Sequence, residues 1–144
     1  HDGRAFEAVA SYCRAVRAGQ AVAVSGTTAS GPDGRALHPG DGYRQTRIAL
    51  ERAIAAVERF GGSPQQVVRT RLFLTPEADW RECVRAHHEL FEGIDPANTG
   101  LVYVCGDWRP AACASERMFG LPICSARQYC AARVSTSTAS WRRG

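Results

Sequence analysis

Hydrophobic periodicity changes repeatedly along this chain, and these changes constrain its fold more than any other feature. Residues 12–26 contain two short β-favouring stretches, the second with strict alternation of apolar and small residues. Over 41–60 the apolar residues recur at three- and four-residue steps, as in an amphipathic helix. The period returns to two in 67–75, becomes helical again in 80–91, and ends in an apolar strand run at 101–105. The chain therefore predicts strands and helices that share one core.

Capping and turn residues set the expected boundaries of these elements. Ala18-Gly19-Gln20 splits the first segment and predicts a hairpin. Asp41 and Asp79 each precede a helical stripe and are expected N-caps, and Gly61-Gly62 is a stop signal. Residues 63–66, SPQQ, predict a single capped turn with a small capping box and proline at its first position.

The resulting order is β-β-α-β-α-β, in one domain over residues 1–144. Such an order places the two helices on one face of a mixed sheet, which is an α+β fold. In the strand at 67–75, the alternation predicts Val68, Thr70, Leu72 and Leu74 on one face, with Val67 on the other.

Composition excludes several classes of protein. The hydrophobic fraction of 44% and charged fraction of 22% are those of an ordinary globular protein. No apolar stretch suggests a bilayer span, and the amino terminus does not resemble a secretory signal, so the expected location is cytoplasmic. The net charge of +4 comes from scattered arginines, which indicates a solvated surface and makes nucleic acid an unfavoured partner.

The six cysteines include no CxxC pair and no Cys/His cluster of the kind that closes a zinc site. We therefore expect no metal and reduced, mostly buried thiols. Cys13 and Cys105 are candidate nucleophiles. For Cys105 packing is favoured, because it alternates with Leu101 and Tyr103 on one strand face and no histidine is predicted near it. His87 lies on the apolar stripe of the second helix, where a packing role is the more common one.

The last third of the chain differs from the rest. Residues 106–144 hold three of the cysteines and no sustained periodicity. A last strand around Met118 to Ser125 is the best local candidate, and residues 135–144 have the composition of a polar tail. The abrupt change after Cys105 leaves two origins open: a genuine alternative ending, or a change of reading frame. Sequencing the coding DNA separates them.

Several segments together resemble the RidA family, also called the YjgF family, over about residues 10–105. They are YCRAV, VSGTT, the run YRQTRIALERAIAAVERFGGSPQQVVRTRLFLT, DWRECVRAHHELF and PANT, in this order. The resemblance implies a chorismate-mutase-like fold and a homotrimer whose sheets form an inner barrel. It also implies clefts between subunits that bind a small metabolite. Relatives hydrolyse 2-imino and enamine acids to 2-keto acids and ammonia without a cofactor or metal.

The resemblance implies a substrate-binding site formed by five residues: Tyr12, Gly26, Thr27, Asn98 and Glu116. Asn98, in PANT, falls where relatives have the arginine that grips the substrate carboxylate, and a neutral amide cannot offer that charged fork. Val84 replaces the family's asparagine, and Glu116 is the nearest counterpart of a late glutamate. The other matched positions are the aromatic Tyr12 and the small-residue turn that contains Gly26 and Thr27.

Three functions remain open at this point. The leading one is a divergent deaminase-like hydrolase of imines or enamines with an altered substrate, its general acid or base unassigned. The second is a trimer that binds a small molecule without catalysis. The third, an endoribonuclease, ranks last because no histidine pair or metal cluster is positioned to cleave a phosphodiester.

Overall fold

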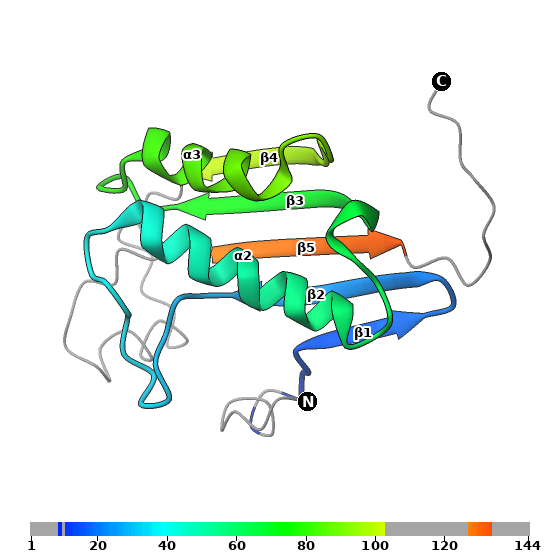
Figure 1. Ribbon diagram of the computed structural model, residues 1–144. Helices are drawn as coiled ribbons and strands as arrows, with labels where there is room; N and C mark the ends of the chain where they lie inside the picture. Colours follow the sequence, from blue (N-terminus) through cyan, green and yellow to red (C-terminus); the bar gives the residue numbers. More distant parts are fainter. Residues whose placement is uncertain (1–8, 10, 103–126, 134–144) are drawn as a thin grey trace.

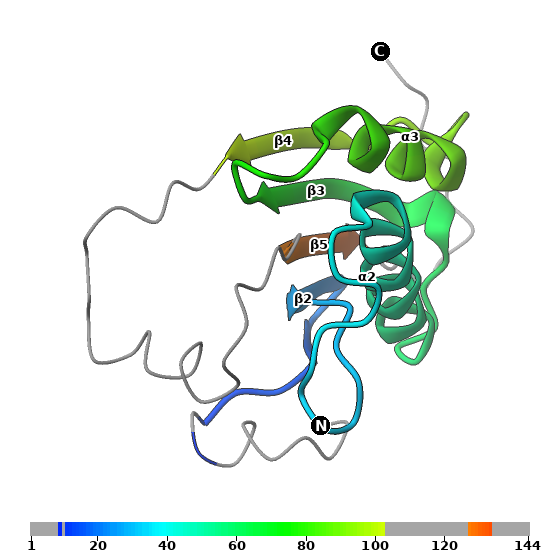
Figure 2. The ribbon, with the colours of Figure 1, turned by 90° about the vertical axis from the view of Figure 1, so that its left-hand side faces the viewer.

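Two helices cover one face of a five-stranded mixed sheet (Figure 1). The computed structural model describes residue 9, residues 11–102 and residues 127–133. Seen from the side, the sheet and the helices form two layers (Figure 2). The elements are β1 (Ala15–Ala18), β2 (Ala21–Thr27), α2 (Gly42–Glu58), the 3-10 turn η1 (Pro64–Gln66), β3 (Val67–Leu74), α3 (Trp80–Phe91), β4 (Ala97–Val102) and β5 (Arg127–Arg133). The predicted α+β class is confirmed.

The sheet has the strand order β1-β2-β5-β3-β4. Only β3 and β4 pair in parallel, joined by α3 as the crossover, and the other three pairings are antiparallel. β1 and β2 form the predicted hairpin, closed by Gly19-Gln20 with Gly19 at a φ of 59°. A positive φ is sterically free only for glycine, so this residue fixes where the chain reverses.

Both helices begin at their predicted N-caps. The Asp41 carboxylate accepts a hydrogen bond from the backbone N–H of Arg44 at 2.8 Å, and that of Asp79 accepts one from Arg81 at 2.9 Å. These bonds satisfy amide groups that have no partner within the first turn of a helix. Gly61, at a φ of 79°, follows the end of α2 as expected.

The core lies between the helices and the sheet, where α2 contributes Leu50 and Val57 and β2 contributes Val22 and Val24. β3 departs from the predicted alternation at its first residues. Val67 is buried, whereas Val68 is 53% exposed, so the assignment of these two residues was wrong. The cause is a shift in the register between β3 and β5 at Val67/Arg69. Such a bulge inserts one residue and reverses the facing of those before it.

The final strand of the sheet is not where the sequence placed it. β5 lies at Arg127–Arg133, between β2 and β3, whereas the strand candidate at 118–125 lies outside the described residues. The strand expected at 101–105 begins earlier, as β4 at Ala97. Tyr103 and Cys105, like the predicted tail at 135–144, are outside the described residues.

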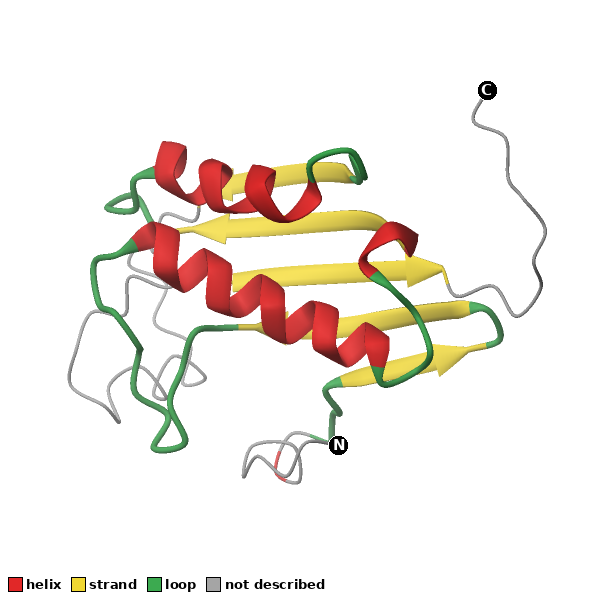
Figure 3. Ribbon diagram, in the orientation of Figure 1, coloured by secondary structure: helices red, strands yellow, loops and turns green. Residues whose placement is uncertain are grey.

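In Figure 3 the helices lie in front of the sheet, and the side view shows no described helix or strand on the opposite face (Figure 2). Successive strand residues face opposite sides of a sheet. Val16 follows the buried Ala15, and Leu101 pairs with Phe73, which follows the buried Leu72, so Val16 and Leu101 point to the uncovered face. Val16 is 53% exposed and Leu101 is 46% exposed. A sheet with apolar side chains on an uncovered face is an expected site of association.

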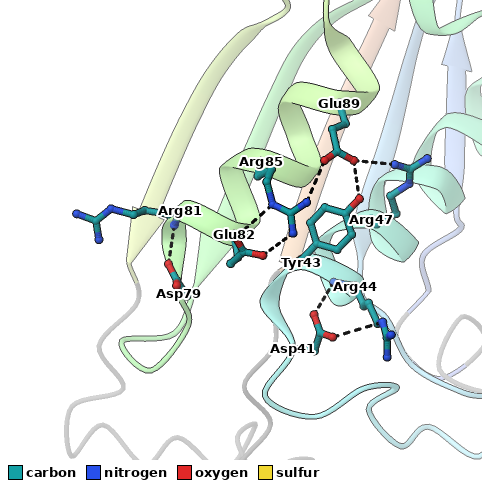
Figure 4. A network of polar contacts seen from close by, with 9 residues as sticks. All are labelled: Asp41, Tyr43, Arg44, Arg47, Asp79, Arg81, Glu82, Arg85 and Glu89. Carbon is teal, nitrogen blue, oxygen red and sulfur yellow. Dashed lines mark hydrogen bonds and ion pairs between the residues drawn. The ribbon is translucent and has the colours of Figure 1, made fainter.

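A polar network joins α2 to α3 on the outer surface (Figure 4). The Tyr43 hydroxyl donates to the carboxylate of Glu89, which also accepts from Arg47 at 3.2 Å and from Arg85 at 3.1 Å. The Arg85 guanidinium lies 3.9 Å from the centre of the Tyr43 ring and pairs with Glu82 at 2.6 Å. The network fixes the two helices relative to each other, although its solvent exposure limits the contribution of each pair.

Removing the Glu89 carboxylate is expected to make stability less sensitive to acid. The hydrogen bond from Tyr43, followed by Arg85 and Arg47, lowers the pKa of Glu89 below its ordinary value of 4.5. A lowered pKa contributes stability that is fully present above the unfolded value and is lost as pH falls through the folded one. Denaturant midpoints of wild type and Glu89→Gln should therefore differ at pH 7 and converge below about pH 4.

The matched control is Glu77→Gln, an exposed carboxylate in the turn before α3 that takes no part in this network. Its midpoint should follow wild type at both pH values. If the denaturant midpoints of wild type and Glu89→Gln differed by the same amount at both pH values, this would contradict the assigned role of the carboxylate.

Candidate functional site

Asn98 is the second residue of β4, and its side chain lies under α3. It pairs in register with Thr70 on β3, which places both residues on the helix-covered side of the sheet. Asn98 Nδ2 donates to Thr70 Oγ1 at 2.8 Å, and the same hydroxyl lies 2.9 Å from Nε2 of His87 on α3. The amide nitrogen itself is 3.5 Å from that ring nitrogen. Three elements therefore bring an amide, a hydroxyl and an imidazole together.

Burial decreases outward through this cluster. Thr70 is 1% exposed, His87 is half-buried, and Asn98 is exposed at the sheet edge. Burial lowers the pKa of His87, and the neighbouring His88 lowers it further, so the imidazole is favoured in its neutral form. The ring also packs against Phe91, with the ring centres 4.8 Å apart. The cluster is thus a neutral hydrogen-bonding group with one member open to solvent.

The position of Asn98 differs in one respect from the prediction. The sequence predicted the strand only from residue 101, which left Asn98 in the connection before it. The tight turn of that connection lies earlier, where Gly93 and Asp95 have φ values of 75° and 52°. Asn98 is held within a strand, and one of its donors is already used by Thr70. His87 was interpreted as a packing residue; it does pack, and it also contacts Asn98. Its spacing on the helix could not reveal this, because the contact depends on the parallel pairing of β3 with β4.

The second group of predicted residues lies at the end of β2. The register between β2 and β5 shifts between Val24 and Thr27, so Ser25 and Gly26 form an irregularity in the strand. Such irregularities redirect backbone groups and are common beside functional sites. Tyr12, which precedes β1, is half-buried. The predicted small-residue turn is therefore present as a bulge.

A buried arginine holds this bulge in place. Arg14 is 8% exposed, and its Nη1 donates to the carbonyl of Gly26 at 3.2 Å and to Thr27 Oγ1 at 3.0 Å. The Thr27 hydroxyl in turn donates to the carbonyl of Ser25 at 2.9 Å. The side chain of Thr27 is thus internal, and its contact with a ligand stays a prediction. The scattered arginines of the sequence predict exposed side chains, and for Arg14 this prediction is wrong. Its burial depends on acceptors supplied by Gly26 and Thr27, which the charge of the side chain does not reveal.

One chain does not bring the two groups together. Asn98 pairs with Thr70, Thr70 with Cys130 and Cys130 with Val24, so three interstrand steps separate Asn98 from β2. At roughly 4.8 Å per step this is about 14 Å, too far for a small molecule to contact both. A site that contains both groups needs a second copy of the chain.

The remaining predicted positions lie on α3 or outside the described residues. Val84, in place of the family's asparagine, is 46% exposed on α3, and Trp80 one turn earlier is 51% exposed. Glu116 lies outside the described residues. Cys13 is a half-buried reduced thiol, and Cys83 is a buried one. Within residues 11–102 and 127–133, no group of three or more His, Cys, Asp or Glu side chains could hold a metal ion. No helix of this same part is long and apolar enough to cross a bilayer.

The two-layer arrangement, the parallel β3–α3–β4 unit and the bulged hairpin define an α+β protein of the chorismate-mutase-like class. The family model for endoribonuclease L-PSP matches residues 3–105. The chain therefore belongs to the YjgF/RidA family.

Known relatives agree with this assignment. An uncharacterized protein of Streptomyces coelicolor, SCO2049, is 40% identical over 100 residues, which is 69% of this chain and 74% of that protein. Rv2704 of Mycobacterium tuberculosis, described as a member of the YjgF/YER057c/UK114 family, is 31% identical with a TM-score of 0.71; the match covers 92% of this chain and 95% of that one. TdcF of E. coli, solved with bound serine, is 20% identical with a TM-score of 0.65; the match covers 86% of this chain and 88% of that one. At this identity the similarity concerns the fold alone.

Proposed function

We propose that this protein is a single-domain, homotrimeric RidA-like hydrolase that binds a small metabolite in clefts between its subunits. The metabolite is an imine or enamine whose anchoring group differs from the carboxylate of amino-acid imines. Water adds across the C=N bond of such a substrate, and the resulting carbinolamine expels ammonia to leave a carbonyl compound. No metal or cofactor takes part in this scheme.

The observation that carries the proposal is the separation of the two predicted halves of the site. Asn98 at the β4 edge and Gly26 at the β2 bulge are separated by three interstrand steps in one chain, which is at least about 14 Å. Association through the uncovered sheet face allows the β2 end of one copy to approach the β4 edge of the next. The exposed apolar side chains of Val16 and Leu101 supply the driving force.

The chemistry near Gly26 supports a role in orienting the substrate. Arg14 donates a hydrogen bond to the carbonyl of Gly26, which orients that peptide plane of the bulge. Pre-organised groups stabilise developing charge without reorganising during the reaction. The bound serine of TdcF shows that this fold can hold a molecule of amino-acid size.

Turnover of 2-iminobutyrate, followed as release of ammonia by the assembled protein, tests the hydrolase. Because the position of the carboxylate-gripping arginine is occupied by Asn98, we expect kcat/KM at least about tenfold below that of a relative with the arginine. A parallel series of imines without a carboxylate should be hydrolysed with the higher kcat/KM. Absence of turnover for every member of both series would refute the hydrolase.

A second candidate is a binding trimer without catalysis. It is favoured by the alteration of two polar site positions of the family, now Asn98 and Val84, and by the fact that one Asn98 donor is used internally. The same series separates the two candidates, because ligands that raise the thermal midpoint without being hydrolysed indicate a binding protein.

Endoribonuclease activity, which the name of the matching family model suggests, receives little support from the described surface. Basic residues of α2 and α3 such as Arg44, Arg47 and Arg85 are paired with Asp41, Glu89 and Glu82 (Figure 4). Paired arginines offer little of the unneutralised positive charge that phosphate binding requires.

A further inference from the structure

The hydrogen bonds among Thr70, His87 and Asn98 determine which way the side-chain amide of Asn98 is turned. A threonine hydroxyl has one hydrogen to donate and two lone pairs that accept. Thr70 Oγ1 accepts from Asn98 Nδ2 at 2.8 Å, so its own hydrogen is free for another acceptor. The available acceptor is His87 Nε2 at 2.9 Å, provided that this nitrogen carries no proton.

A second contact agrees with this direction. Asn98 Nδ2 faces His87 Nε2 at 3.5 Å, and two N–H groups at this separation would repel. The burial that keeps His87 neutral allows Nε2 to be unprotonated. The hydrogen bonds therefore run in one direction, from the amide of Asn98 to the hydroxyl of Thr70 and on to the imidazole.

This direction sets the polarity that Asn98 presents to solvent. One Nδ2 hydrogen is donated to Thr70 Oγ1, and the nitrogen also faces His87 Nε2, so both inner partners lie on the Nδ2 side of the amide. The carbonyl oxygen Oδ1 is the atom on the other side, and among the described residues it accepts no hydrogen bond. A carboxylate that approached this position would meet another acceptor. A ligand with an N–H group would find a partner.

We propose that Thr70 and His87 orient the amide of Asn98 so that this position of the cleft selects ligands that donate a hydrogen bond, such as carboxamides, over carboxylates. The inference rests on the proposed function, because it assumes that a ligand reaches Asn98. It makes Thr70 and His87 positioning residues for substrate selection. An arginine at this position would donate hydrogen bonds to a ligand, whereas the oriented amide of Asn98 accepts one.

The direction of the hydrogen bonds can be tested without any ligand. In protein labelled with 15N at histidine, the ring nitrogen shifts of His87 at pH 7 should report the neutral tautomer with hydrogen on Nδ1. A hydrogen on Nε2 would reverse the whole chain, turn the amide of Asn98 around and overturn the proposal. This result does not depend on whether the protein is a hydrolase.

Selection itself is tested with a pair of matched probes, butanamide and butyrate, titrated into the full-length assembled protein and followed by NMR at Asn98. We expect butanamide to bind about tenfold more tightly than butyrate. The amide N–H of butanamide can donate to Asn98 Oδ1, whereas the carboxylate of butyrate would place a second acceptor beside it. Preference for butyrate, or no shift at Asn98 with either probe, overturns the proposal. Failure of the hydrolase is read separately, from the imine assay.

Variants then assign the preference to the cluster. The double substitution Thr70→Val with His87→Phe replaces both inner partners of Asn98 by apolar groups of similar shape. The amide can then rotate, and the ratio of the butanamide and butyrate affinities should fall towards one. Thr99→Val is the matched control, because Thr99 accepts from Arg69 on the opposite face of the sheet. If the double variant does not fold, Asn98→Leu at the exposed position must likewise abolish the preference. Retention of the tenfold ratio in the variant examined refutes the proposal.

Discussion

Ala23→Asp is expected to convert the assembled protein into monomers at micromolar concentration, as measured by light scattering coupled to size exclusion. Ala23 is exposed in one chain and lies on the sheet face that the helices leave uncovered, beside Val16 in the pairing of β1 with β2. In the proposed trimer this face lines the inner barrel. Each of the three subunits would bury one aspartate carboxylate near the common axis, without a cation to pair with it.

The physical reason for so large an effect is desolvation. An uncompensated buried charge costs about 3–5 kcal/mol, and each interface of the trimer would carry that cost. A penalty of this size weakens association by more than about a hundredfold. The monomer itself should remain folded, because aspartate in a strand costs only about 1 kcal/mol or less in intrinsic propensity.

Ala55→Asp provides the matched control. Ala55 is also an exposed alanine, but it lies on α2, on the other side of the sheet from the proposed barrel. It should leave the oligomer unchanged. A wild-type protein that is already monomeric, or an Ala23→Asp protein that remains a trimer, would contradict the proposed assembly, and with it the intersubunit cleft.

The elements that the sequence predicted correctly are those specified by local chemistry. Asp41 and Asp79 cap the helices through their own side chains, and Gly19 permits the hairpin turn through its own φ. These interactions span a few residues, so spacing along the chain is sufficient to find them. The same holds for the capping box at residues 63–66, where Gln66 accepts from the backbone N–H of Ser63 at 2.9 Å.

The features that were missed depend on pairing between distant segments. The reversal at Val67 and Val68 arises from a bulge against β5, and β5 itself is inserted between strands that are closer to each other in sequence. Arg14 is buried because Gly26 and Thr27 on the next strand supply acceptors. Periodicity describes one segment at a time, so it cannot report such partners.

The candidate site was predicted in part for the same reason. Asn98 was selected through the family resemblance, but its contact with His87 requires β3 and β4 to be parallel and in one particular register. His87 on an apolar stripe has the pattern of a packing residue. Only the sheet register shows that its ring nitrogen shares the hydroxyl of Thr70 with an exposed amide.

Asn98→Arg is expected to raise the affinity for a carboxylate ligand such as butyrate by about ten- to a hundredfold. A guanidinium offers two parallel, charge-assisted hydrogen bonds to a carboxylate, each about twice as strong as a neutral one. His87 is favoured in its neutral form by burial, so it adds no positive charge that would oppose the new cation. The same change should also raise kcat/KM for 2-iminobutyrate if the reaction centre is otherwise intact.

Asn98→Lys separates geometry from charge in this experiment. An ammonium group supplies one point charge without the planar fork, so its gain in butyrate affinity should be clearly smaller. Equal gains for lysine and arginine would show that general electrostatic attraction, and not a carboxylate clamp, acts at this strand edge. A gain in affinity without any gain in turnover would mean that the cleft binds the substrate but lacks the groups that deliver water and protons. In that case the binding trimer, and not the hydrolase, describes what this chain does.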